Sequence, residues 1–293
     1  MKGLKKIALA TAVAAVPFAA NADLKALDDS AMGNVTGQAG VTIELETKVS
    51  IGQFKYTDEG SFAVNDIVLG GAGVTAAGST AGYNDLLDQL KIDIDVADDG
   101  DAIIHVGTLD SNPIDWGMTV GSMELLAGST GSDSTTLISN LSGWGNLAQL
   151  DISVDTASDH LNVVAAFDVQ DMDFDVEFLG IGIRDLTISG AGANFDYDGD
   201  GSVMSADADG EFGLDPASQE AQVLAGFANV NLDVYKGAGL GASTASDVLR
   251  IDVNNVYMDV AIGETIIGGK NIGTIAIDNL AVTDTKLAVY GHD

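Results

Sequence analysis

The stretch VQDMDFDVEF, residues 169–178, decides the fold class, because apolar and acidic residues alternate along it. Met172 and Phe174 fall on one side of an extended chain, whereas Asp171 and Asp173 fall on the other. A period of two is typical of a strand with one buried and one solvent-facing side. It favours antiparallel sheets over parallel sheets, whose strands are apolar on both sides. The pattern therefore predicts an all-β protein with an anionic outer face.

The same period recurs along most of the chain, and two sequence phrases repeat. The segments IDIDVADDGDAI (92–103) and LDISVDTASDHL (150–161) align without gaps. A shorter phrase, apolar-x-polar-apolar-x-apolar, follows an apolar-Gly step each time and appears as VNDIVLGG (64–71), IRDLTISG (183–190) and IDNLAVTD (277–284). Three or four irregular hairpin units explain this pattern better than a strict solenoid, whose period is more constant. We expect an elongated antiparallel sandwich or roll built from such units.

Several segments interrupt the strand pattern. Residues 23–40 have apolar residues near helical spacing and a glycine stop, so they predict a short N-terminal helix ahead of a β-rich region at 41–293. A second short helix is expected near 83–90, and 128–146 is expected to be a polar connector and a possible subdivision of the β-rich region. Residues 191–221 form the longest insertion.

That insertion contains DYDGDGSVMSAD, residues 196–207, whose spacing matches a calcium-binding loop. The expected metal ligands are the side chains of Asp196, Asp198, Asp200 and Asp207 and the backbone carbonyl of Ser202. Gly201 permits the sharp turn, and Asp instead of Glu at the last position resembles dockerin-type repeats. The alternative is a solvated acidic turn, since Asp and Gly are ordinary turn residues. We expect Ca²⁺ to order the insertion, because no helix pair flanks the loop for the ion to open.

Residues 1–22 predict a secretory signal peptide. Lys2, Lys5 and Lys6 precede an apolar run that ends at an Ala20-Asn21-Ala22 cleavage site. The expected locations are the extracellular space, the cell surface or a pilus, with the periplasm as an alternative. No later stretch is long and apolar enough to predict a transmembrane helix.

Charge restricts the partners further. After cleavage, 9 basic residues face 44 acidic ones, which gives 9 − 44 = −35. Such a chain repels nucleic acid and anionic lipid, but it attracts divalent cations. With 46% hydrophobic residues it can still fold, and with no cysteine it must do so without disulfides.

No catalytic constellation is evident in the sequence. The three histidines, His105, His160 and His292, lack neighbours typical of zinc sites or of a Ser-His-Asp triad. With 44 acidic residues, the presence of paired carboxylates has no diagnostic value. The sequence therefore predicts a protein that is not an enzyme.

The segment LKALDDSAMGNVTGQAGVTIELE, residues 24–46, resembles the mature N-terminus of the FilA-like pilus-system protein family, with VTGQAG (35–40) as the core of the match. The resemblance implies export and association with a surface fibre, and it transfers no catalytic residue. We therefore expect a secreted or cell-surface, calcium-stabilised structural or adhesive protein, associated with pili or matrix subunits or with copies of itself. An outer-membrane β-barrel and a secreted hydrolase with structural calcium are the alternatives.

Overall fold

The computed structural model describes residues 40–73, 85–109, 112–128, 133–191 and 226–291. All of these belong to one unit, residues 40–293. The predicted signal peptide, the predicted N-terminal helix and the predicted calcium loop at 196–207 lie outside the described residues. None of the helical segments that the structure describes combines the length and the apolarity needed to cross a bilayer.

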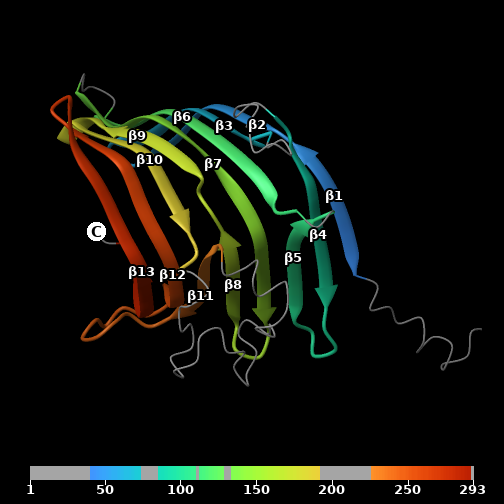
Figure 1. Ribbon diagram of the computed structural model, residues 1–293. Coiled ribbons are helices and arrows are strands. Elements are labelled where there is room, and N and C mark those ends of the chain that lie inside the picture. Colours follow the sequence, from blue (N-terminus) through green and yellow to red (C-terminus); the bar gives the residue numbers. More distant parts are fainter. Residues whose placement is uncertain (1–39, 74–84, 110–111, 129–132, 192–225, 292–293) are drawn as a thin grey trace, which may run out of the picture. The chain divides into compact units, whose positions relative to one another are not determined.

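Within the described ranges, thirteen strands form one sheet in which every pairing is antiparallel, so the expectation of an antiparallel all-β protein is confirmed (Figure 1). A sandwich requires two sheets, whereas the described strands form one. The strands are β1 (Val41–Thr47), β2 (Val49–Thr57), β3 (Ser61–Gly70), β4 (Leu87–Val96), β5 (Ala102–Thr108), β6 (Ile114–Leu126), β7 (Ser134–Asp155), β8 (His160–Phe167), β9 (Asp171–Val176), β10 (Ile181–Ser189), β11 (Ala228–Gly237), β12 (Val248–Ile267) and β13 (Lys270–Val289). A 3₁₀ turn, η2 (Glu177–Leu179), links β9 to β10.

Two local expectations were wrong. The helix expected near 83–90 is contradicted at its C-terminal end, where Leu87 to Leu90 begin strand β4. Residues 134–146 were expected in a polar connector, but they form the first part of the long strand β7.

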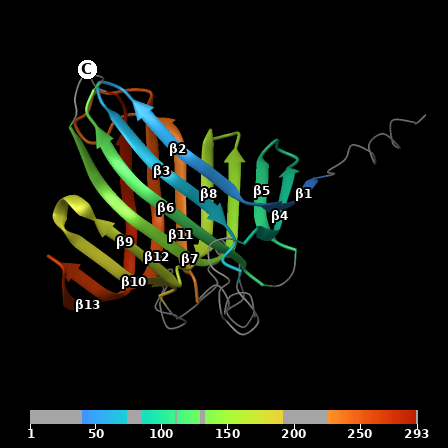
Figure 2. The ribbon, with the colours of Figure 1, turned by 90° about the horizontal axis from the view of Figure 1, so that it is seen from above.

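The sheet consists of two tiers that share their longest strands. The first tier has the order β1-β4-β5-β7-β8-β11-β12 and uses the C-terminal part of β7 and the N-terminal part of β12. The second tier has the order β2-β3-β6-β7-β9-β10-β12 and uses the other parts of β7 and β12. Figure 2 shows β2, β3 and β6 side by side in the second tier. Strand β13 pairs with β12 along both tiers.

Because β1 and β2 are separated only by Lys48, they follow one another along one edge of the sheet. Strand β13 forms the opposite edge. The sheet therefore has eight strand positions, some occupied by one long strand and others by one short strand in each tier.

Left-handed residues inside strands explain the repeated short phrase. Asp66, Asp185 and Asn279 occupy the same place in its three copies and have φ angles of 53°, 52° and 57°. Asn140, within ISNL (138–141) of β7, has a φ of 53° and forms a fourth case that the sequence comparison missed. Each such residue shifts the alternation by one, so that apolar residues spaced three apart stay on the same side of the sheet. Asp and Asn tolerate this conformation better than most residues.

The described residues build no thick core. Every residue of β9 is half-buried, and no large side chain among the residues that the structure describes is completely buried. The most buried apolar residues include small ones such as Ala63, Ala166 and Ala228. The alternation predicted one buried face of the sheet. Among the described residues, that face is only partly buried.

Candidate functional site

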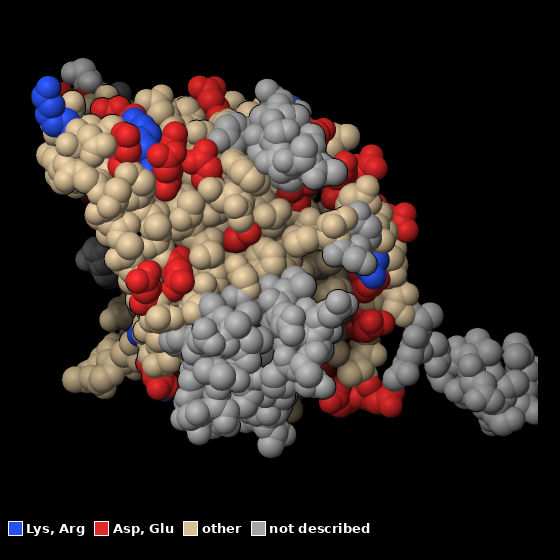
Figure 3. All heavy atoms as spheres, in the orientation of Figure 1, with Lys and Arg blue, Asp and Glu red and all other residues tan. Residues whose placement is uncertain are grey.

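Acidic side chains are spread over the face of the molecule shown in Figure 3, where basic ones are sparse. Among the described residues, Asp171, Asp173 and Asp185 form the group of carboxylates that could hold a metal ion. One oxygen from each lies within 4.8 Å of the others. We call these three residues the acidic cluster.

Strands β9 and β10 bring the acidic cluster together. Asp171 and Asp173 lie two positions apart on β9, so they share one side of the sheet. Asp185 lies on the adjacent strand β10, where its left-handed backbone lets its amide donate a hydrogen bond to Asp173 Oδ1, at 2.9 Å. The acidic cluster therefore depends on the β9–β10 hairpin and on the backbone shift at Asp185.

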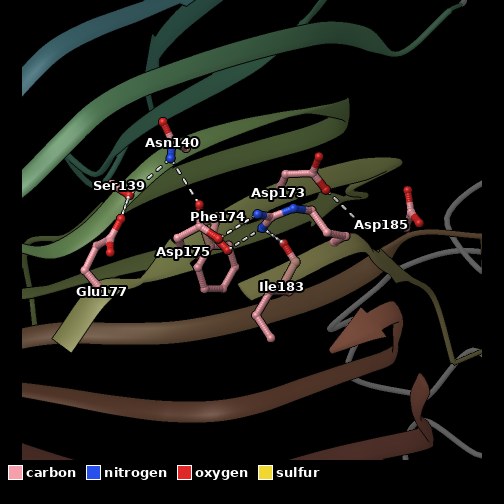
Figure 4. A network of polar contacts seen from close by, with 9 residues as sticks. Ser139, Asn140, Asp173, Phe174, Asp175, Glu177, Ile183 and Asp185 are labelled. Carbon is pink, nitrogen blue, oxygen red and sulfur yellow. Dashed lines mark hydrogen bonds and ion pairs between the residues drawn. The ribbon is translucent and has the colours of Figure 1, made fainter. Parts of the chain in front are cut away.

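A neighbouring network of polar contacts uses the next carboxylate of β9 (Figure 4). Arg184 forms an ion pair with Asp175, with 2.6 Å between Nη2 and Oδ1, and also donates to the carbonyl of Phe174. Asn140 of β7 donates to the other oxygen of Asp175, at 3.1 Å. Arg184 is thus engaged by Asp175 and forms no ion pair with the acidic cluster.

The pKa of Asp171, in the acidic cluster, and the pKa of Asp175, which pairs with Arg184, shift in opposite directions. Partial burial, together with the charges of Asp173 and Asp185, raises the pKa of Asp171 above its ordinary range. Burial also works to raise the pKa of Asp175, but the hydrogen bonds from Arg184 and Asn140 outweigh it and hold that pKa below its ordinary range. The acidic cluster therefore concentrates negative charge, and its oxygens are of the hard type that Ca²⁺ prefers.

The sequence predicted only part of the arrangement of the acidic cluster. Alternation placed Asp171 and Asp173 on one side of a strand, but it gave no sign that Asp185 would join them. The predicted ligands Asp196, Asp198, Asp200, Ser202 and Asp207 lie outside the described residues, so the calcium loop stays a prediction.

A second polar row crosses the first tier. His105 Nδ1 lies 2.5 Å from Asp151 Oδ1, and its cross-strand neighbour on β4 is Asp93. Asp93 accepts a hydrogen bond from Thr42 and forms an ion pair with Lys91, at 2.9 Å. Farther along this tier, the ring of His160 stacks on Tyr235 with 4.1 Å between the ring centroids. The Lys91–Asp93 pair lies within β4, and the other contacts tie adjacent strands together across the sheet.

The two edges of the sheet hold half of the exposed large hydrophobic residues. Of 24 such residues in the described ranges, seven lie on β1 and β2 and five on β13. Tyr56 is 60% exposed at one edge, and Ile272 is 63% exposed at the other. Edge strands carry unpaired backbone donors and acceptors, and long apolar edges favour pairing with another chain.

Comparison with protein families finds a similarity in the N-terminal part of the chain. The model of a family of unknown function, DUF6160, matches residues 1–98. No curated protein and no solved structure matches the chain. This similarity covers the first third of the chain, and the matched range ends between strands β4 and β5.

Proposed function

We propose that this chain is an exported structural protein of the cell surface, which associates with pili or extracellular matrix through the edges of its sheet and is stabilised by calcium. The observation that carries the proposal is the pair of long sheet edges, β1 with β2 on one side and β13 on the other, because sheet edges bind other strands through main-chain hydrogen bonds. The predicted signal peptide supports export, and the resemblance of residues 24–46 to FilA-like proteins supports a fibre or its assembly machinery as the partner.

The edges carry lysines, such as Lys55 and Lys286, and register shifts, but other usual protection against pairing is missing. Natural edge strands are often short, or carry proline or inward-pointing charge. Here β13 has 20 residues, and neither edge contains a proline. An apolar series that includes Ile43, Ile51 and Ile277 instead remains exposed. A partner strand would cover these side chains and satisfy the free backbone groups.

Calcium enters the proposal through charge. A net charge of 9 − 44 = −35 on the mature chain opposes association, because like-charged subunits repel one another. Bound or screening cations reduce this repulsion. The loop at 196–207 is the proposed calcium site. The acidic cluster is the competing candidate for calcium binding, so the two sites must be compared by mutation.

Sedimentation velocity of residues 23–293 over a range of concentrations tests the association. We expect oligomers in calcium-containing buffer, and we expect Ile43→Lys and Ile277→Lys to shift the protein toward monomer. The matched control is Ile103→Lys, which changes an equally exposed apolar residue on the interior strand β5. A wild-type protein that stays monomeric at every concentration, with and without calcium, contradicts the proposal.

Calorimetric titration with calcium tests the metal. We expect the paired change Asp196→Ala and Asp200→Ala to remove binding that the wild type shows. The pair Asp171→Asn and Asp173→Asn is the comparison. Loss of binding in the second pair alone would move the site to the acidic cluster, and unchanged binding in the first pair would refute the loop assignment.

A further inference from the structure

The two edges of the sheet run in opposite directions. Every pairing in the sheet is antiparallel, so strand direction alternates from one position to the next. With eight positions, the edge formed by β1 and β2 is antiparallel to β13. If an identical copy is placed beside the first in the same orientation, its β1 and β2 therefore lie antiparallel to the first copy's β13, which continues the pattern of the sheet.

The edges also match in length. Strands β1 and β2 together with Lys48 span 41–57, which is 7 + 1 + 9 = 17 residues, and β13 spans 20 residues. Both edges extend along both tiers. A joint between them can therefore continue both tiers at once.

Their side chains match at the first-tier end. Val41 and Ile43 lie on one side of β1, and Leu287 and Val289 lie on the same side of the sheet, because registered pairs connect the rows strand by strand from β1 to β13. All four residues are more than one third exposed. Antiparallel pairing of Val41 with Val289 brings Ile43 opposite Leu287, so apolar meets apolar on this side.

The opposite side carries two unmatched charges. Glu44 on β1 has Lys91 as its cross-strand neighbour, but Lys91 pairs with Asp93, at 2.9 Å. Lys286 on β13 has Asp252 as its neighbour, but Asp252 is held by Arg250, at 2.7 Å, and by the Tyr235 hydroxyl. Within the described part of the chain, neither Glu44 nor Lys286 has an ion pair. The register that pairs Val41 with Val289 places these two opposite charges beside each other.

We propose that copies of this chain join head to tail, with β13 of one copy paired antiparallel to β1 and β2 of the next, in the register Val289–Val41, Leu287–Ile43 and Lys286–Glu44. This inference rests on the proposed function and specifies its joint. Because the joint uses two different surfaces, it leaves one edge free at each end, and further copies add to an open, polar filament. A twofold joint of like edges would stop at a dimer.

A charge exchange between variants tests the joint. Lys286→Glu alone places two glutamates at every junction, and Glu44→Lys alone places two lysines there. Each variant alone should assemble about two- to fivefold more weakly than the wild type, as expected for like charges on facing strands. An equimolar mixture restores an opposite pair at every junction, so sedimentation should return to the wild-type distribution. A mixture no better assembled than either variant would overturn the register.

Cysteine cross-linking tests the polarity independently, because the natural chain has no cysteine. After oxidation, we expect Ile43→Cys and Leu287→Cys to form a covalent dimer when mixed and not when each is oxidised alone, with Ala157→Cys in the β7–β8 turn as the control. The double variant should give a ladder of covalent oligomers. Dimers from one variant alone would show a twofold joint, and cross-linked monomers from the double variant would show pairing within one chain. Either result overturns the inference. If the wild type assembles without the mixed dimer, only the joint is wrong, whereas a monomeric wild type removes the proposed function as well.

Discussion

Asp185 on β10 lies directly opposite Gly263 on β12, and a Cβ atom added at Gly263 would stand 2.7 Å from the Cβ of Asp185. The left-handed Asp thus requires glycine on the neighbouring strand. Gly121 has the same relationship with Asp66, at 3.1 Å.

Gly263→Ala should therefore lower the free energy of unfolding by about 1–3 kcal/mol, the usual cost of overpacking. Chemical denaturation monitored by circular dichroism measures this change. Gly52→Ala is the control, because a Cβ at Gly52 meets no atom within 4 Å. Equal effects of the two changes would show that close approach is not the reason for glycine at position 263.

Asp66 tests the left-handed backbone itself. Asp66→Asn should leave stability nearly unchanged, whereas Asp66→Val should cost about 1–3 kcal/mol, because a β-branched residue resists a φ of 53°. Thermal unfolding of the two variants provides the comparison. A valine variant as stable as the asparagine variant would mean that the one-residue shift of the strand alternation at Asp66 does not depend on this backbone conformation.

The acidic cluster should make the fold less stable as pH rises through the titration of Asp171. Its pKa is raised in the folded protein, so the folded state binds this proton more tightly than the unfolded state does, and ionisation is destabilising. Asp171→Asn removes that ionisation and should raise stability at neutral pH while leaving it little changed in acid. Denaturation curves at several pH values check the sign. A destabilised variant at neutral pH, measured without divalent cations, would contradict the electrostatic account.

Asp175 should behave in the opposite way. Its pKa is lowered, mainly because Arg184 and Asn140 outweigh burial, so its contribution is present above the ordinary carboxyl pKa and is lost as pH falls through the folded pKa. Asp175→Asn should therefore destabilise the protein at neutral pH, by about 0.5–1.5 kcal/mol, and have less effect in acid. The same denaturation series measures both variants.

Association should strengthen with ionic strength. The chain has a net charge of −32, and residues 23–293 alone have 9 − 44 = −35, so its copies repel one another, and salt shortens the range of that repulsion. The screening length is about 14 Å in 0.05 M sodium chloride and about 4 Å in 0.5 M sodium chloride. Sedimentation in these two buffers should therefore show larger species at the higher salt concentration. Smaller species at high salt would indicate that attraction between charges dominates the joint.

The sequence predicted strands well where alternation was unbroken, as in β9, but misjudged the start of β4. Leu87 and Leu90 are three residues apart, a spacing typical of a helix. In the structure Gln89 has a φ of 56°, and the left-handed residue produces that spacing within a strand. A pattern of apolar residues alone cannot distinguish these two causes, because both place the residues on one side.

The acidic cluster was only partly predictable for a related reason. The positions of Asp171 and Asp173 follow from the period of one strand. Their closeness to Asp185 depends on the register of β9 with β10 and on the backbone at Asp185, which are tertiary properties. The backbone conformation at Asp185 did have a signal in the sequence phrase IRDLTISG, because the alternation of apolar residues breaks at Asp185.

Strands β7 and β12 take part in both tiers, and this has a consequence for how the sheet comes apart. A tier held together only by its own short strands could melt by itself. Here the loss of either tier strips hydrogen-bonded partners from half of β7 and half of β12, which weakens the other tier at the same time. We therefore expect the described sheet to melt in a single cooperative transition, with equal calorimetric and van't Hoff enthalpies.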